Sequence, residues 1–271
     1  AKITNDDTNY RLLTQFYLYK TQQLLSASST DTTELQKQVL ASLNNAIASS
    51  KTAISIDSND YNNYMSLGSI YAFWMGLDKE NKEQYYKNAK DVYTQALTVY
   101  PKNPTILLTL AQLEYSYSQD STATINSIQK SLDLKPNYSA AYSMLSQLAS
   151  QNNDREGALK YATQAVQADP NSVDAYIQFG ILSLGTKTPT KEDLSNAYFA
   201  FSTVLQADSS NLTAAYYLAI TFTLAKDYAN ANALADSLLK SLPDEEKIKE
   251  LKTYIATEQG KSSTQTTTTT K

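Results

Sequence analysis

A similar segment that ends in proline recurs along the chain at a nearly constant spacing. The segments QALTVYPKN, KSLDLKPNY and QAVQADPNS place Pro101, Pro136 and Pro170 at separations of 35 and 34 residues. Pro243 lies 73 residues further on, which leaves room for two more units. A period of this length is typical of solenoids, in which each unit buries its apolar face on its neighbours. When the matching position at Ser58 is included, the spacing predicts six units, two of them with insertions.

Each unit carries small and large apolar residues at similar places. The unit over residues 139–172 has Tyr142, Leu145, Ala149, Ala158, Ala162, Ala165 and Pro170. This arrangement resembles the tetratricopeptide repeat, a unit of about 34 residues whose small side chains let two helices approach closely. The resemblance implies an all-α fold: a right-handed superhelical solenoid of about six helical hairpins with a C-terminal capping helix.

Two other units match the pattern through a glycine in the first helix and larger residues at other pattern positions. The second unit has Gly68, Tyr93 and Ala96, and the fifth has Gly180 and Phe201, with Ser183 where a second aromatic is expected. We expect these side chains to form the core. The insertions of the two units, at 75–83 and 185–191, are predicted to lie in the turns inside their hairpins.

The resemblance covers residues 30–243. Residues 1–29 are predicted to form an off-pattern helix, which is either a cap or an assembly element. Residues 244–260 are predicted to form a capping helix that stops at Gly260, since Ile248, Leu251 and Ile255 recur at helical spacing. The remaining residues, 261–271, form a neutral, Thr-rich tail.

Composition argues against several classes of function. Charged residues are 18% of the chain and the net charge is -4, whereas a nucleic-acid partner requires a clustered basic surface. The chain has no Cys and no His, which removes thiolate chemistry, the usual zinc ligands and imidazole bases. No phosphate-binding or nucleophile motif occurs, and no apolar stretch is long enough to span a membrane. We therefore expect a protein that is not an enzyme and has no cofactor, no metal, no nucleic-acid partner and no membrane span.

The resemblance implies that partners bind in the inner groove, lined by the first helix of each hairpin. The positions projected into this groove are Asn62, Met65, Ser69, Thr105, Leu108, Gln112, Ser143, Gln147, Ile177, Ile181, Thr213, Tyr216 and Ile220. Lys and Arg, which hold an acidic carboxylate in some members of the family, are missing from this set. A neutral, Ser/Thr-rich or apolar segment is therefore the expected partner.

A neutral groove, a neutral tail and open solenoid ends together favour self-assembly. Contact between unlike ends is heterologous, and it propagates as a filament unless its rotation closes. The preferred interpretation is a non-catalytic protein-interaction scaffold that assembles head-to-tail with itself. The alternative is an envelope-associated adaptor that binds a neutral segment of another protein. An enzyme within the repeat scaffold is the least favoured interpretation.

Two weak features bear on location. The chain opens at Ala1, which is an acceptable first residue after signal cleavage. Asn137 and Asn211 begin the triplets NYS and NLT, which match the glycosylation acceptor pattern. We therefore expect an extracellular or cell-surface protein that has lost an N-terminal segment, with a trimmed chain as the alternative.

Overall fold

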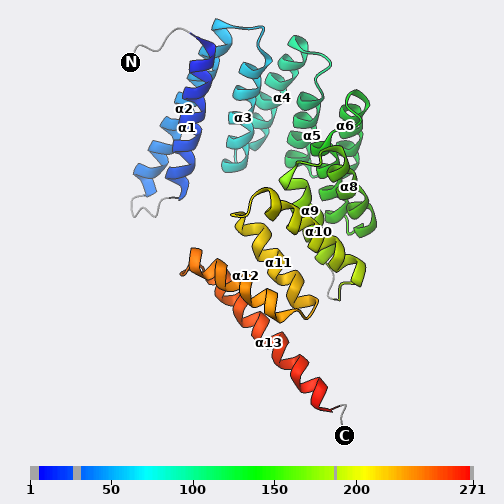
Figure 1. Cartoon of the computed structure of the whole chain (residues 1–271). Helices are drawn as coiled ribbons and strands as arrows, with labels where there is room; N and C mark the ends of the chain where they lie inside the picture. The colour runs from blue at the N-terminus through cyan, green and yellow to red at the C-terminus, as the bar shows by residue number, and fades with distance from the viewer. Residues whose placement is uncertain (1–5, 27–31, 186–187, 269–271) are drawn as a thin grey trace. The chain divides into compact units, whose positions relative to one another are not determined.

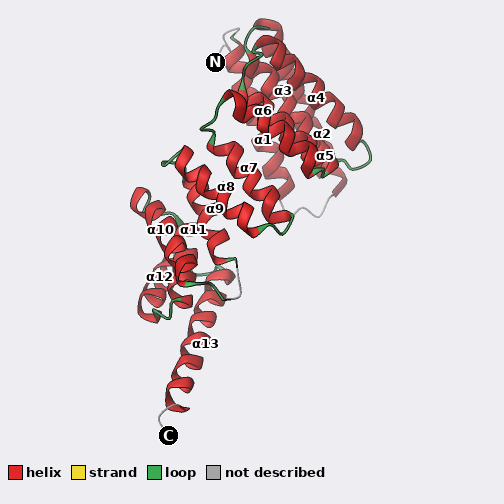
Figure 2. Cartoon of the chain, turned by 90° about the vertical axis from the view of Figure 1, so that its right-hand side faces the viewer, coloured by secondary structure: helices red, strands yellow, loops and turns green. Residues whose placement is uncertain are grey.

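The computed structural model describes residues 6–26, 32–185 and 188–268. Over these residues it contains thirteen helices and no strand (Figure 2). The chain divides between Pro136 and Asn137 into two compact units. Consecutive helices pack as pairs, and within each unit the main contacts of a helix are with its nearest and next-nearest neighbours along the chain. The predicted all-α solenoid of helical hairpins is confirmed.

The first unit holds three hairpins, whose helices lie side by side in Figure 1. They are α1 (Asp7–Ser26) with α2 (Thr32–Ile56), α3 (Tyr61–Leu77) with α4 (Lys82–Val99), and α5 (Pro104–Ser118) with α6 (Ser121–Leu134).

The second unit holds three more hairpins and a final helix. They are α7 (Ser139–Gln151) with α8 (Arg155–Ala168), α9 (Val173–Leu184) with α10 (Lys191–Ala207), α11 (Leu212–Leu224) with α12 (Tyr228–Ser241), and α13 (Glu246–Thr268). The predicted apolar residues of α13, Ile248, Leu251 and Ile255, are buried against Ala231, Ala235 and Leu238 of α12 and Ala219 of α11.

The repeated prolines end the second helix of a hairpin, as the sequence predicts. Pro101, Pro170 and Pro243 each follow the C-cap residue of α4, α8 and α12 directly. Pro136 follows Lys135, the C-cap of α6. Proline cannot donate the next backbone hydrogen bond, so the chain leaves the second helix at the same place in each of these hairpins.

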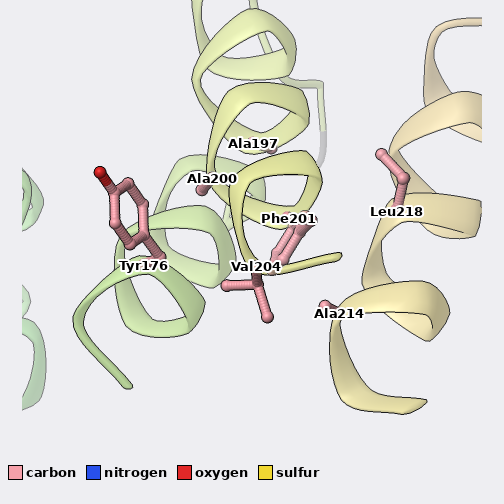
Figure 3. Packing of buried hydrophobic residues seen from close by; sticks show 7 residues of the cluster. All are labelled: Tyr176, Ala197, Ala200, Phe201, Val204, Ala214 and Leu218. Carbon is pink, nitrogen blue, oxygen red and sulfur yellow. The ribbon is translucent and has the colours of Figure 1, made fainter. Parts of the chain in front are cut away.

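Close approach of paired helices depends on a small residue that faces a large one. A Cβ atom built on Gly68 of α3 would overlap the Tyr93 ring of α4. One built on Gly180 of α9 would lie 2.5 Å from the ring of Phe201 on α10. In Figure 3, Phe201 lies between Tyr176 of α9 and Leu218 of α11, so one aromatic side chain joins consecutive hairpins.

The first hairpin achieves the same close approach with hydroxyl residues. Thr14 and Thr21 of α1 and Ser42 and Ser50 of α2 are buried. The Thr14 hydroxyl lies 3.0 Å from that of Ser50, and the Ser42 hydroxyl donates to the Tyr17 carbonyl at 2.8 Å. Because each hydroxyl finds a partner, these small polar side chains can replace Ala and Gly inside the core.

The structure differs from the sequence-based prediction at the end of the chain. Helix α13 does not stop at Gly260 but continues to Thr268. The φ angle of Gly260 is not positive, whereas a glycine that ends a helix commonly has a positive φ. A Cβ atom built on Gly260 would meet nothing within 4 Å. A glycine inside a helix costs about 1 kcal/mol and does not by itself end it. Residues 269–271 of the predicted tail lie outside the described residues.

The two insertions are only partly loops. In the second hairpin α3 continues to Leu77 and α4 begins at Lys82, so the turn itself is residues 78–81. In the fifth, the turn between Leu184 and Lys191 is longer, and residues 186–187 lie outside the described part. Most of the first insertion therefore lengthens the helices of its hairpin.

An ion pair braces consecutive hairpins in the second unit. Arg155 of α8 donates to the Asp193 carboxylate of α10 at 2.8 Å and to the Ser183 carbonyl of α9 at 3.2 Å. Thr190, the N-cap of α10, donates to the same carboxylate through its backbone N–H and its hydroxyl. The hydrogen bond from Arg155, aided by those from Thr190, holds the pKa of Asp193 below its ordinary value of 3.8.

This pKa shift predicts a pH-dependent contribution to stability. A lowered pKa means that the folded state favours the ionised carboxylate, so the contribution is complete above pH 3.8 and is lost as the pH falls through the lower, folded-state pKa. Arg155→Met should therefore destabilise by about 0.2–1 kcal/mol at neutral pH, because the pair is partly exposed. Urea unfolding should show a smaller difference from wild type at acid pH. Lys160→Met in the same helix is the control, and an unchanged difference across pH would contradict the assignment.

The surroundings of the two glycines of α3 predict opposite effects of alanine substitution on stability. Gly68→Ala should destabilise by about 1–3 kcal/mol, since the added methyl overlaps the Tyr93 ring. Gly76→Ala, in the same helix, should instead stabilise by about 0.5–1 kcal/mol because it relieves the cost of a helical glycine. A Cβ at Gly76 meets nothing within 4 Å. Urea unfolding followed by circular dichroism measures both, and equal effects would show that the helices do not approach as described.

Candidate functional site

A pocket of about 660 Å³ opens in the first unit between α3, α4 and α5. It is lined by Ala72, Met75, Gly76, Lys79, Lys82, Tyr93, Thr109, Gln112, Leu113 and Ser116. Its walls are therefore the C-terminal half of α3, the turn after it, and one face of α5. This volume lies within the range of roughly 300–1,000 Å³ that is usual for ligand sites.

The apolar floor of the pocket is part of the folded core. Met75, Tyr93 and Leu113 are buried and belong to one hydrophobic cluster with Ala89. Tyr93 is the residue that fills the space beside Gly68, so its ring is held by the hairpin itself. Burial raises the pKa of the Tyr93 hydroxyl above its ordinary value of 10.0, which keeps the phenol neutral at physiological pH. The floor is thus rigid and uncharged.

The polar wall comes from α5. Thr109, Gln112 and Ser116 follow one another at helical spacing and all three line the pocket. The start of α5 is fixed by Asn103, a buried N-cap whose side chain accepts from the backbone N–H groups of Thr105 and Ile106 at 2.9 and 3.3 Å. A neutral wall of hydroxyl and amide groups therefore faces the pocket on a well-anchored helix.

Two lysines give the pocket a basic rim. The Lys82 ammonium donates to the Tyr117 carbonyl at 2.9 Å and lies 5.2 Å from the centre of the Tyr117 ring. An ammonium has three donors, so this contact positions Lys82 while leaving capacity for a ligand. Lys79 is exposed in the preceding turn, where Asp78 accepts from the backbone N–H groups of Glu80 and Asn81.

Helices α4 and α5, which both line the pocket, are held together by side-chain contacts. The Lys90 ammonium of α4 donates to the Tyr86 hydroxyl at 3.2 Å and to the Glu114 carboxylate of α5 at 3.1 Å. These hydrogen bonds raise the pKa of Lys90 above its ordinary value, so it stays charged. Tyr86 stacks on Tyr117 with ring centres 4.0 Å apart. The distance between α4 and α5 is therefore set by contacts outside the pocket.

The predicted groove residues fall into three groups by exposure. Those that are exposed are Asn62, Ser69, Thr105, Gln112, Gln147, Ile181 and Thr213. Those that are half-buried are Met65, Ser143, Ile177, Tyr216 and Ile220. Leu108 is only 8% exposed, so its assignment to the groove was wrong and it belongs to the core. Of the predicted set, only Gln112 lines the pocket.

Several half-buried groove residues are held by packing. Met65 packs against the cluster that contains Tyr93, and Ile177 against the one that contains Phe201. Tyr216 and Ile220 pack against the cluster that anchors α13. These residues contribute to the fold, and whether any of them also contacts a partner stays a prediction.

Four of the nine pocket residues that sequence reasoning missed lie in the first insertion. Met75, Gly76, Lys79 and Lys82 all fall within residues 75–83. The signal was present, because an insertion into a regular repeat shows where one unit differs from the others. Only the structure shows that the added residues turn toward α5.

The predicted glycosylation sites differ in their surroundings. Asn137 is exposed. Asn211 is half-buried and is the N-cap of α11, where its side-chain oxygen accepts from the Ala214 backbone N–H at 2.9 Å. Modification of either residue stays a prediction.

Other kinds of site were sought in the described part of the chain. Over residues 6–26, 32–185 and 188–268, no group of three or more Asp and Glu side chains is arranged to hold a metal ion. Within the same ranges, no helix combines the length and apolar character needed to cross a lipid bilayer.

A tetratricopeptide-repeat family model matches residues 139–172, the unit that also fits the sequence pattern best. No curated protein sequence matches the chain. Among solved structures, the Pseudomonas aeruginosa pilF protein is 14% identical with a TM-score of 0.57, and the match covers 91% of this chain and 98% of that one. PilW, a widely conserved type IV pilus biogenesis factor, is 15% identical with a TM-score of 0.58, covering 88% and 98%. YrrB, a tetratricopeptide protein with an unusual peptide-binding site, is 18% identical with a TM-score of 0.51, covering 75% and 97%. These likenesses confirm the repeat fold.

Proposed function

We propose that this chain of tetratricopeptide-type hairpins is a non-catalytic scaffold that binds an extended segment of another protein in the pocket between α3, α4 and α5. The observation that carries the proposal is the pocket's composition: a fixed apolar floor, a neutral polar wall and a basic rim. Repeats of this family generally act as scaffolds for other proteins, and the peptide-binding site of YrrB gives one example on a similar fold.

The three surfaces of the pocket suggest what the segment looks like. The floor of Met75, Tyr93 and Leu113 suits one apolar side chain. Gln112 of the polar wall can donate to and accept from a peptide backbone. The ammonium groups of Lys79 and Lys82 suit a carboxylate beside that apolar residue. A segment with a carboxylate carries more charge than the neutral segment expected from the projected groove. The difference arises because the two lysines lie in the first insertion, which the projected groove does not include.

A side chain placed at Gly76 provides a direct test of the pocket. Gly76→Trp should fill it without disturbing the core, because a Cβ there meets nothing within 4 Å. We expect the variant to lose at least tenfold in affinity for peptides that pair an apolar residue with an acidic one. Such peptides can be selected from an array in which the anchor and the flanking charge vary independently, and affinities measured by fluorescence anisotropy.

Matched variants separate blocking from unfolding. Gly260→Trp, at the other helical glycine with open space, should bind as wild type does. Lys79→Met with Lys82→Met should weaken binding of acidic peptides while leaving the neutral ones unchanged. If no peptide binds, or if Gly76→Trp binds as tightly as wild type, the pocket is not the binding site.

Assembly of the chain with itself is the second candidate. The head-to-tail filament and the extracellular or cell-surface location expected from the sequence both stay predictions. The likeness to pilus biogenesis factors is one of fold alone and carries no location.

A further inference from the structure

We propose that Tyr117 is a positioning residue of the pocket, which holds Lys82 at the rim and makes that lysine the group that selects a carboxylate. The proposal deepens the proposed function and rests on it, because it concerns the same pocket between α3, α4 and α5. It assigns unequal roles to the two rim lysines. Lys82 determines the preference for acidic segments, and Lys79 contributes little to it.

The side chain of Lys82 reaches from the first residue of α4 to the last turn of α5. Its ammonium donates to the Tyr117 carbonyl at 2.9 Å and lies over the ring of the same residue, 5.2 Å from the ring centroid. This distance is within the roughly 6 Å at which the face of a ring attracts a cation. The last turn of a helix also carries the negative end of the helix dipole, which favours a cation. One residue and its helix end therefore hold Lys82 in three ways.

None of these contacts neutralises the charge of Lys82. Among the described residues, no carboxylate forms an ion pair with it, and its partners are a carbonyl and a ring. Lys90 of the same helix differs, because its ammonium is paired with the Glu114 carboxylate at 3.1 Å. An ammonium has three donors, so Lys82 keeps both N–H groups and an uncompensated charge for a ligand. A carboxylate that reaches it would form a charge-assisted hydrogen bond.

The ring of Tyr117 is itself held in place. Tyr86 of α4 stacks on it with ring centroids 4.0 Å apart and an interplanar angle of 8°. The Tyr86 hydroxyl accepts from the Lys90 ammonium at 3.2 Å. Both tyrosines are half-buried and pack against the hydrophobic cluster that forms the pocket floor. The ring beneath Lys82 is therefore fixed by the same core that fixes the apolar part of the site.

Lys79 has no comparable support. It is exposed in the turn after α3, and it makes no hydrogen bond, ion pair or ring contact with the described residues. A long side chain that moves freely loses rotamer freedom when it binds a ligand, and this loss weakens the interaction. Lys82 has already given up much of that freedom in the folded chain. We therefore expect the carboxylate of the bound segment to lie at Lys82, near the C-terminal end of α5.

Peptide binding by single variants tests these roles. The readout is the ratio of affinities for two peptides that share the apolar residue and differ only in a Glu or a Gln beside it, measured by fluorescence anisotropy. Lys82→Met should lower this ratio by about tenfold, as expected when a hydrogen bond between charged groups is lost. Lys79→Met is the matched control and should leave the ratio close to that of wild type.

The variants of Tyr117 test positioning. Tyr117→Leu should lower the ratio by about threefold, because the ring contact with the ammonium is lost. Tyr117→Phe keeps the ring and should bind as wild type does. A purely structural role of Tyr117 would weaken both peptides equally and leave the ratio unchanged. Circular dichroism checks that each variant is folded.

A double variant shows whether Tyr117 acts through Lys82. In the Lys82→Met background, Tyr117→Leu should have no further effect on the ratio, so the two effects should not add. Additive effects would overturn the positioning role. An effect of Lys79→Met equal to that of Lys82→Met would overturn the unequal roles of the lysines.

NMR of the free protein tests the positioning without a peptide. After isotope-labelled methyl groups are added to the lysines, the signal of Lys82 is identified by its loss in Lys82→Met. It should lie upfield of the Lys79 signal, because the Tyr117 ring shields it. Tyr117→Leu should abolish this shift and Tyr117→Phe should keep it. A Lys82 signal that Tyr117→Leu leaves unchanged would overturn the proposal.

The outcomes distinguish this proposal from the function on which it rests. If no peptide binds, or if Gly76→Trp binds as wild type does, the pocket is not the binding site and both proposals fail. If Gly76→Trp blocks binding but Tyr117→Leu leaves the ratio of affinities unchanged, the pocket binds peptides and only the role of Tyr117 fails.

Discussion

The structure depends on how closely two paired helices can approach. That distance is set where a residue with little or no side chain faces a large one, as Gly68 faces Tyr93 and Gly180 faces Phe201. The large ring then has a fixed place, and it also reaches beyond its own hairpin. Phe201 packs between α9 and α11, and Tyr93 forms part of the pocket floor against α5. The contact that closes a hairpin therefore also positions the surface that the next hairpin, or a partner, meets.

Much of this fold could be predicted from the sequence because its period is marked by residues with one physical role. Proline ends a helix, and alanine or glycine marks a close approach. The number of repeat units therefore followed from the spacing, and their helical class from their resemblance to the tetratricopeptide repeat. The first hairpin escaped the pattern because Thr14, Thr21 and Ser42 take the small positions, and only their buried hydrogen bonds show that a hydroxyl can serve there. Three turns inside hairpins also use residues with positive φ that are not glycine, at Gln119, Asn153 and Lys226. Of these, only asparagine commonly signals such a turn.

The candidate site was harder to predict than the fold. Projecting a groove from helical spacing placed Leu108 at the surface, whereas packing between helices buries it. A small error in the angle of a helix face is enough to exchange core and surface positions. That projection did not include the lysines of the pocket, because Lys79 lies in a turn and Lys82 at the start of α4. Residues that break a repeat have no counterpart in other units from which their direction could be inferred.

The local packing of the hairpins has a mechanical consequence. Within each unit, the main contacts of each helix are with helices no more than two positions away along the chain. Every hairpin can therefore form soon after it leaves the ribosome, without waiting for distant sequence. Because the main contacts are local, contacts between helices far apart in the sequence would do little to oppose tension applied to the ends of the chain. The hairpins would then open one after another from the ends, as a series of small extensible elements in place of a single cooperative rupture.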